Sequence, residues 1–422
     1  MNRSGQPIFH GWWNVLVAFN GMALSYAMFT VFTFGTFVRP LEQEFGWARG
    51  EISFALTMTN FAVVIASPSI GSLLDRFGVR AVLIPSTLLM GLAVASMSLL
   101  SGELLHFYAM YLLIPLLGAG TLPQSYSRVI INWFHRRRGI ALGLALSGFG
   151  VGAALVPVCA QYLIEHIGWR FAYLAFGAAV LGISLPLALF LMRESPREMG
   201  LEPDGVPSAG QGEAPDPPQP DSGLSIREAA GTTSFWLIFG SFLLVGVAIT
   251  GILAHLVPML IGRGVAPEVA ARCMSLLGIG LICGRVISGY LMDRYFAPYV
   301  TAFFLTFLFG GAVILALGLG GAAPFLAALM VGLATGSEIS EIAYLCSRYF
   351  GPRAFCLIYG TMFAAFQIGS AFGPPLMGYY YDGAGNYTGA LWGLAGLAVT
   401  GAVLIAVLGP YPAGFGVPAR EE

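Results

Sequence analysis

A single arginine lies within a long apolar, glycine-spaced stretch, where a permanent positive charge is costly. The stretch reads Gly280-Leu-Ile-Cys-Gly284-Arg285-Val-Ile-Ser-Gly289. A guanidinium keeps its proton, so in hydrocarbon it needs an anion, a carboxylate partner or water beside it. Its planar fork fits a carboxylate with two hydrogen bonds. Arg285 is therefore our first candidate for binding an anionic substrate, and the alternative is a permanent structural pair with a glutamate of a neighbouring helix.

Two glutamates lie in a second apolar stretch, one helical turn apart. Glu338 and Glu341 would share a similar helix face. Two carboxylates that close in a medium of low dielectric constant do not readily both ionise, so at least one could carry a proton. We expect one of them to be the proton-coupling site and the alternate partner of Arg285 when substrate is absent. The alternative is that one pairs with Arg285 or Arg348 and holds two helices in register.

Four further polar residues interrupt apolar stretches and could line a transport path. Gln124 and Tyr126, beside Pro123, could hydrogen-bond a substrate carboxylate or hydroxyl, or could serve a helix–helix contact. Arg128 falls at the inner edge of the same stretch, where it would contact an inner gate or extend its guanidinium to the interface. His255 falls near the outer boundary of another stretch. Because histidine titrates in the physiological range, we expect an outer proton or substrate contact, with a satisfied interfacial histidine as the alternative.

The composition predicts the membrane-spanning elements that position these residues. Of 422 residues, 57% are hydrophobic and only 10% are charged, against roughly 25% charged in soluble domains. Runs of about 20 apolar residues are long enough to cross a hydrocarbon core. The sequence therefore predicts an all-α membrane protein with twelve spans: 12–37, 51–73, 80–101, 106–132, 139–163, 169–192, 233–260, 270–292, 297–318, 323–347, 354–380 and 388–410.

The spans divide into six and six. Residues 1–192 and 233–422 form the two halves, and 193–232 form a cytoplasmic linker whose middle, Gly205–Gly223, has the composition of a flexible segment. Thirteen arginines fall in loops on the side of the N-terminus and five on the other side. By the positive-inside rule, both termini are expected in the cytoplasm.

The two halves repeat each other at a constant spacing. Gly71-Ser-Leu-Leu-Asp75-Arg76 recurs as Gly289-Tyr-Leu-Met-Asp293-Arg294, and Pro157 recurs as Pro374. Repeated halves are the plan of many secondary transporters, whose substrate site lies near mid-membrane where the halves meet. We expect the Asp75-Arg76 and Asp293-Arg294 pairs to form a conformational latch, because such aspartates can accept hydrogen bonds from helix N-termini. Arg285 corresponds to Ser67, so its charge has no counterpart in the first half.

Two blocks of sequence resemble a known family. Gly71-Ser-Leu-Leu-Asp75-Arg76-Phe-Gly78-Val-Arg80 resembles the signature loop of the major facilitator superfamily. Trp133-Phe134-His-Arg136-Arg137-Arg138 and the helix after it are similar to the monocarboxylate transporters and their bacterial oxalate/formate antiporter-like relatives. The resemblance covers nearly the whole chain and implies that Arg285 binds a substrate carboxylate. His10 stands where that family usually has an acid. A bacterial cytoplasmic (inner) membrane location is the corresponding expectation.

Other functional classes find little support in the sequence. The five cysteines form no metal-ligand spacing, and no phosphate-cradling loop or nucleophile–base pair is present, so we expect no cofactor, metal site or enzymatic activity. The basic run Arg136–Arg138 follows the positive-inside rule rather than marking a nucleic-acid site. The leading hypothesis is a monomeric secondary transporter that moves a lactate- or pyruvate-like monocarboxylate with a proton. The rivals are an organic anion exchanger of oxalate/formate type, a drug or metabolite efflux transporter and a membrane receptor.

Overall fold

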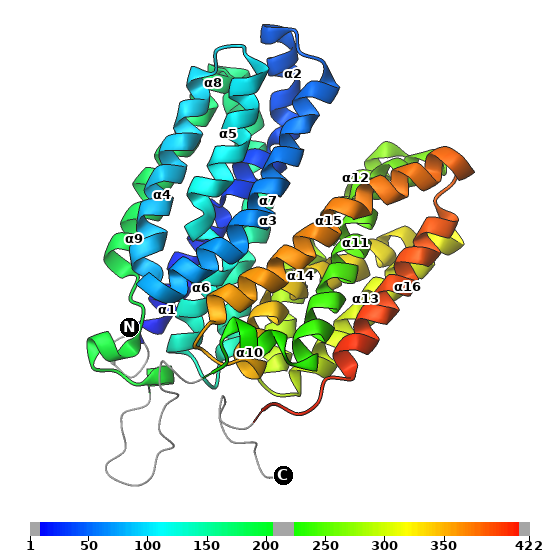
Figure 1. The fold of residues 1–422 in the computed structure, drawn as a ribbon. Helices are drawn as coiled ribbons and strands as arrows, with labels where there is room; N and C mark the ends of the chain where they lie inside the picture. The colour runs from blue at the N-terminus through cyan, green and yellow to red at the C-terminus, as the bar shows by residue number, and fades with distance from the viewer. Residues whose placement is uncertain (1–8, 206–222, 413–422) are drawn as a thin grey trace, which may run out of the picture. The chain divides into compact units, whose positions relative to one another are not determined.

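The computed structural model describes residues 9–205 and 223–412, which are helical with no strand in these ranges (Figure 1). Within these ranges, twelve helical segments are long and apolar enough to cross a membrane. Each overlaps one of the twelve predicted spans, so the predicted all-α membrane fold is confirmed. Residues 206–222, which make up most of the predicted flexible segment, lie outside the described residues.

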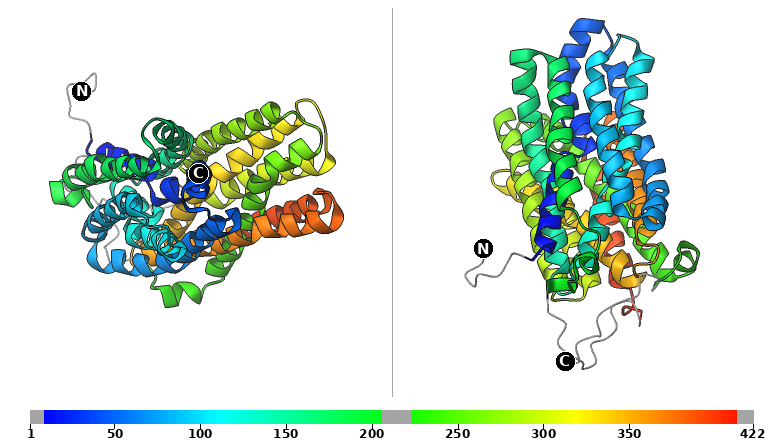
Figure 2. Two further views of the ribbon diagram at one scale, coloured as in Figure 1. Left: turned by 90° about the horizontal axis from the view of Figure 1, so that it is seen from above. Right: turned by 90° about the vertical axis from the view of Figure 1, so that its left-hand side faces the viewer.

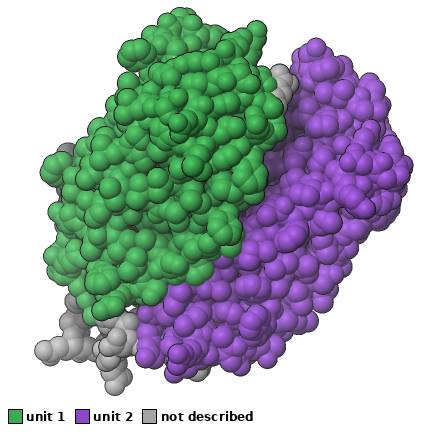
Figure 3. Space-filling view, turned by 45° about the horizontal axis from the view of Figure 1, so that its top comes forward, with its two compact units in different colours: residues 1–136, 144–215 green, residues 137–143, 216–422 purple. Residues whose placement is uncertain are grey.

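The chain forms two compact units, coloured separately in Figure 3. Unit 1 contains Met1–Arg136 and Leu144–Pro215, and unit 2 contains Arg137–Gly143 and Asp216–Glu422. Unit 1 includes most of the predicted first half, 1–192, and unit 2 includes the predicted second half, 233–422, while the predicted linker, 193–232, is divided between them. Arg137–Gly143, which include the start of α7 (Arg138–Ile167), group with unit 2, while the rest of that helix belongs to unit 1.

Unit 1 builds its six spans from nine α-helices, because three of the spans are interrupted. Two interruptions are π-helical turns, Met28–Phe32 in the first span and Val180–Ser184 in the sixth. The α-helices are α1 (Gly11–Ala23), α2 (Phe34–Phe45), α3 (Arg49–Phe77), α4 (Val79–Ser96), α5 (Leu104–Leu117), α6 (Pro123–Trp133), α7 (Arg138–Ile167), α8 (Trp169–Ala179) and α9 (Leu185–Leu191).

The fourth span differs from the continuous helix that the sequence predicts. A 3-10 turn, Gly118–Thr121, follows α5, and Leu122 then adopts an extended conformation before α6 begins at Pro123. A residue that precedes proline is sterically biased away from the helical conformation, and proline itself favours the first helical position. The break places Gln124 and Tyr126 in the first turn of α6.

Unit 2 is built from longer, uninterrupted helices. After α10 (Ile226–Ala230), its spans are α11 (Thr233–Gly262), α12 (Pro267–Met292), α13 (Ala297–Leu317), α14 (Ala323–Tyr349), α15 (Phe355–Ala384) and α16 (Thr388–Ala406). α12 packs along α14, α11 along α15, and α13 along both α14 and α16. In both views of Figure 2 the helices within each unit run alongside one another.

Paired glycines hold α12 and α14 in close contact. A Cβ atom added at Gly280 or Gly284 of α12 would meet the backbone of α14, and one added at Gly332 or Gly336 would meet the backbone of α12. Each pair has the four-residue spacing that brings transmembrane helices together through small residues. The backbone next to Arg285 therefore lies directly against α14.

The twofold repeat extends to the capping of equivalent helices. In unit 1, Glu194 Oε1 accepts a hydrogen bond of 2.6 Å from the backbone N–H of Arg80, in the first turn of α4. In unit 2, the Tyr411 hydroxyl accepts one of 2.9 Å from the backbone N–H of Ala297, in the first turn of α13. Both donors would otherwise be unpaired groups at a helix N-terminus. The segment after each unit's last span thus caps its third span.

The same two segments also bind the end of each unit's fourth span. Trp133 Nε1 donates to the carbonyl oxygen of Arg193 at 2.8 Å. The Tyr349 hydroxyl donates to the carbonyl oxygen of Gly409 at 2.6 Å. The equivalent contacts use different side chains in the two units, so the repeat preserves hydrogen-bonding geometry rather than residue type.

Candidate substrate and proton site

Arg285 lies two-thirds of the way along α12 and is almost completely buried, with 1% of its surface exposed. Its Nε donates a hydrogen bond of 2.8 Å to the backbone oxygen of Gly336 on α14. The close glycine contact between the two helices brings that carbonyl within reach. One edge of the guanidinium is thereby fixed, and the planar fork keeps further N–H donors for other partners.

Glu338 and Glu341 are both buried on α14, as the sequence predicts for a shared helix face. Their exposed fractions are 5% and 1%. Glu338 interacts electrostatically with Arg285 and with Glu341. Among the described residues, Glu338 Oε2 and Glu341 Oε1 are buried without a hydrogen-bond partner. Unit 2 therefore brings together the cation and the two carboxylates that we singled out.

Tyr359 of α15 is a member of this cluster that sequence reasoning missed. It is fully buried, interacts electrostatically with Arg285 and Glu338, and donates a hydrogen bond of 3.4 Å to the carbonyl oxygen of Ile339. Its signal in the sequence is weak, because tyrosine is common in membrane helices. A polar side chain ten residues after the end of α14 could have suggested the contact.

His255 lies in α11, away from the Arg285 cluster and near the end of the span. Its Nε2 lies 3.0 Å from the carbonyl oxygen of Pro374 on α15, and its Nδ1 lies 3.2 Å from the Tyr387 hydroxyl. A carbonyl only accepts, so Nε2 carries the proton in the neutral ring and Nδ1 accepts from Tyr387. These contacts satisfy both nitrogens of the half-buried ring, as expected for a structural histidine. A role in transport stays a prediction.

The predicted unit 1 contacts lie at the break in the fourth span. Gln124 and Tyr126 are buried in α6, and Gln124 Nε2 donates to the backbone oxygen of Ser67 on α3 at 3.0 Å. Ser125 and Ser127 are also buried there, and their hydroxyls have no partner among the described residues. Sequence reasoning missed both serines. Arg128, the predicted inner-gate residue, is half-buried one turn further along α6.

Asp293, at the end of α12, caps the N-terminus of α7 within unit 2. Its two carboxylate oxygens accept hydrogen bonds from the backbone N–H groups of Gly139 at 2.6 Å and Ile140 at 2.9 Å. A Cβ atom at Gly139 would meet the backbone oxygen of Gly289, so glycine permits the close approach. An acidic group at a helix N-terminus is favourable because of the orphan donors and the helix dipole.

The other predicted latch residues have different surroundings. Asp75 is half-buried near the end of α3. Arg76 and Arg294 are exposed, and their guanidinium carbons lie 5.1 Å and 4.1 Å from the ring centroids of Phe77 and Tyr290. The contact with α7 therefore uses the aspartate of the Asp293-Arg294 pair, while its arginine packs on an aromatic ring.

Within residues 9–205 and 223–412, no group of three or more histidine, cysteine, aspartate or glutamate side chains could hold a metal ion. Among the described residues of unit 2, the buried charged side chains are one guanidinium and two carboxylates, on the facing helices α12 and α14. Such a set can bind an anion and exchange a proton.

Comparison with known proteins identifies the family. The sequence model of the Major Facilitator Superfamily matches residues 18–355. This chain belongs to the Major Facilitator Superfamily.

Relatives of this major facilitator protein are transporters rather than enzymes. It is 27% identical to monocarboxylate transporter 11 of Mus musculus over 397 residues, which cover 90% of this chain and 83% of the relative. It is 28% identical to monocarboxylate transporter 13 of Bos taurus over 408 residues, covering 94% and 87%. The major facilitator protein described here is therefore a multi-pass membrane transporter related to monocarboxylate transporters.

The fold also matches a solved structure of the superfamily. The crystal structure of the major facilitator transporter FucP in the outward conformation superposes with a TM-score of 0.68, covering 93% of this chain and 98% of that chain at 17% identity. At this identity the match concerns the fold alone.

Proposed function

We propose that this protein is a secondary active transporter that moves a small monocarboxylate, of lactate or pyruvate type, together with a proton by alternating access. The observation that carries the proposal is the buried Arg285 beside Glu338 and Glu341 on α14. Membrane-buried ionisable residues commonly mark substrate paths and proton relays. The relationship to monocarboxylate transporters supports the same substrate class.

Charge counting within the cluster supports coupled binding. With all three groups ionised, Arg285, Glu338 and Glu341 carry a net charge of −1, so a single proton on one glutamate makes the cluster neutral. When a carboxylate then binds Arg285, a second proton restores neutrality. Because uncompensated charge in a buried site is costly, the substrate anion and the proton are bound together.

The roles within the cluster follow from the contacts. Glu338 is proposed as the coupling residue, since it interacts with Arg285 and would compete with substrate for the guanidinium. Glu341 would hold the resident proton, and Tyr359 would position the guanidinium and Glu338. We also propose that the substrate contacts Gln124, Tyr126 and His255, and that Arg128 contributes to the inner gate.

Asp75-Arg76 and Asp293-Arg294 are proposed to act as the conformational latch. For Asp293, the capping contact with α7 supports this role, because a cap that holds the start of a helix can be broken when that helix moves. We also propose a bacterial inner-membrane location, cytoplasmic termini and a monomeric state.

A thermal-shift measurement tests substrate recognition directly. L-lactate should raise the melting temperature of the purified protein, whereas lactamide, a neutral analogue of similar size, should not. Arg285→Gln should abolish the shift, and Arg272→Gln, which changes an exposed arginine nearer the start of α12, should retain it. A lactate shift that persists undiminished in Arg285→Gln would remove Arg285 from the site.

An uptake measurement in proteoliposomes separates symport from exchange. Lactate uptake into empty vesicles should be saturable and should accelerate when the outside is acidic. Uptake that ignores the pH gradient and requires an organic anion inside the vesicle would instead establish the exchanger. The efflux alternative fits less well, because a buried guanidinium is unfavourable in a cavity for uncharged hydrophobic compounds.

A further inference from the structure

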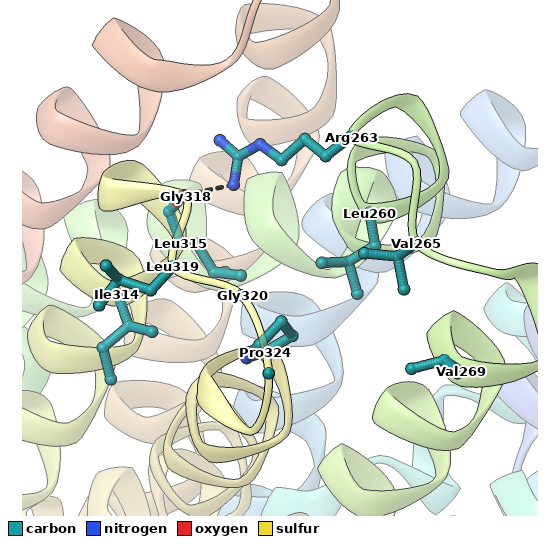
Figure 4. Close-up of a pocket in the computed structure, with 11 residues that line it drawn as sticks. Leu260, Arg263, Val265, Val269, Ile314, Leu315, Gly318, Leu319, Gly320 and Pro324 are labelled. Carbon is teal, nitrogen blue, oxygen red and sulfur yellow. Dashed lines mark hydrogen bonds between the residues drawn. The ribbon is translucent and has the colours of Figure 1, made fainter.

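A cavity lies at the opposite end of unit 2 from the chain's entry into α11. It encloses about 270 Å³ between the end of α11, the start of α12 and the turn that joins α13 to α14. Apolar side chains form most of its wall, among them Leu260, Val265, Val269 and Ile314 (Figure 4). Among the described residues that line it, Arg263 is the only charged one.

The guanidinium of Arg263 is fixed at the edge of this cavity. Its Nη1 donates a hydrogen bond of 2.5 Å to the backbone oxygen of Leu315, in the last turn of α13 (Figure 4). Gly318 follows in a left-handed conformation with φ of 64°, and a Cβ atom there would lie 3.9 Å from the same nitrogen. The C-terminal end of α13 thus orients the arginine, because carbonyl groups at a helix C-terminus attract cations.

Arg263 has no protein counter-ion in the described part of the chain. It is in neither the Arg170–Glu44 nor the Arg353–Glu228 ion pair, and burial is the one cause that lowers its pKa. A guanidinium nevertheless stays protonated and has five N–H donors, of which the contact with Leu315 uses one. A partly buried cation with spare donors, beside an apolar cavity, is suited to an anionic group that carries an apolar chain.

The position of the cavity favours a lipid as the source of that group. It lies where the apolar spans of α11 and α13 end, at Gly262 and Leu317. Leu319, which lines the cavity, is 52% exposed, and Ile261 and Leu317, each next in sequence to a lining residue, are 43% and 56% exposed. Spans end at the boundary between acyl chains and headgroups, and basic pockets between transmembrane helices can bind lipid headgroups.

We propose that this cavity binds an anionic phospholipid, whose phosphate contacts Arg263 and whose acyl chain enters the space lined by Val265, Val269 and Ile314. With the proposed orientation of the chain, this lipid belongs to the outer leaflet. The site is separate from the Arg285 cluster. It lies at the N-terminal end of α14, so bound lipid would steady the helix that carries Glu338 and Glu341.

The test compares two lipids on the purified full-length protein in detergent. Dioleoylphosphatidylglycerol should raise the melting temperature by about 2–4 °C more than an equal mole fraction of zwitterionic dioleoylphosphatidylcholine. Arg263→Gln should remove this difference, and Arg272→Gln, which changes an exposed arginine on α12 that does not line the cavity, should retain it. Val269→Trp fills the cavity without removing the charge and should also abolish the difference, which keeps the test available if Arg263→Gln does not fold.

Three results would overturn the proposal. The first is the same melting temperature in both lipids for the unaltered protein. The second is a phosphatidylglycerol effect that survives Arg263→Gln or Val269→Trp. The third is an equal stabilisation by inorganic phosphate, because it would replace the lipid with a soluble anion.

Discussion

At the scale of single residues, Glu338 and Glu341 are alike in type and burial but differ in their neighbours. Glu338 interacts electrostatically with Arg285, whereas Glu341 interacts with Ser337 on its own helix. In the proposed mechanism, Glu338 is therefore the glutamate that exchanges with a substrate carboxylate at the guanidinium. This difference allows the two glutamates to be tested against each other.

The first prediction concerns the paired variants Glu338→Gln and Glu341→Gln. Glutamine resembles a protonated glutamate and cannot take up a proton. We expect Glu338→Gln to bind lactate but to lose stimulation of uptake by an acidic outside, while Glu341→Gln keeps it. Initial uptake rates at several outside pH values provide the measurement. The reverse pattern would assign coupling to Glu341.

The second prediction concerns the shape of the cation. Arg285→Lys keeps the charge but removes the bidentate fork and the Nε–H that binds the carbonyl oxygen of Gly336. Loss of the bidentate fork and of the Nε–H should weaken lactate binding by roughly tenfold or more. A tenfold change in affinity corresponds to about 1.4 kcal/mol of binding free energy. Isothermal titration calorimetry measures the affinity. Equal affinity in the lysine variant would show that charge alone is recognised.

At the scale of helices, the glycine contact between α12 and α14 positions Arg285. The third prediction is that Gly284→Ala destabilises the protein by about 1–3 kcal/mol and weakens lactate binding, because the added methyl group meets the backbone oxygen of Leu333. Gly278→Ala on the same helix is the matched control, since a Cβ there has no neighbour within 4 Å. Thermal unfolding and lactate titration report the two effects. If Gly284→Ala changed neither the stability nor the lactate affinity, the close contact between α12 and α14 would not be what positions Arg285.

The fourth prediction concerns α2 and α8 in unit 1. Burial opposes ionisation of Glu44, but hydrogen bonds from Arg170 and Trp169 outweigh it and hold the pKa of that carboxyl below its usual value. A lowered pKa in the folded state stabilises the protein above the unfolded-state value of about 4.3, and this contribution disappears as the pH falls through the folded-state pKa.

Glu44→Gln should accordingly lower the melting temperature by roughly 1–2 °C at pH 7, as expected for an exposed ion pair, and by less as the pH falls below about 4. Glu103→Gln, an exposed carboxylate at the start of α5, is the control and should change little. A difference between the parent and Glu44→Gln that stays constant down to low pH would contradict the assignment.

The helices themselves could largely be predicted from the sequence. Hydrophobic length sufficed for all twelve spans, because a helix that satisfies its own backbone is the stable spanning form in lipid. The break before Pro123 was missed although its proline was visible, since proline within a membrane helix can equally produce a bend. The glycine pairs could be seen, but which helix each pair faces depends on packing across the fold.

The candidate site could be predicted in part. Arg285, Glu338 and Glu341 stood out because charge is rare in these spans, and the structure brings them together. Tyr359, Ser125 and Ser127 did not stand out, because hydroxyl side chains are common in membrane helices and their burial becomes apparent only from the packing. Glu194 and Tyr411 cap equivalent helices from segments of unlike sequence, so no pattern connected them.

At the scale of the whole molecule, charge balance is the constraint that joins these observations. The family establishes a membrane transporter, and the buried cluster of Arg285, Glu338 and Glu341 in unit 2 is the basis for the proposed symport. If a carboxylate and a proton bind together, the loaded site carries no more charge than the empty one. Movement of the loaded site across the membrane then meets no added electrostatic barrier.

The most direct test of proton-coupled carboxylate binding is proton uptake when lactate is added to the purified protein in a weakly buffered solution near pH 7. A pH electrode or indicator dye measures the protons, and calorimetry measures the bound lactate. We predict about one proton taken up for each lactate bound in the unaltered protein, and none in Glu338→Gln. Saturable lactate binding to the unaltered protein without proton uptake would contradict the account.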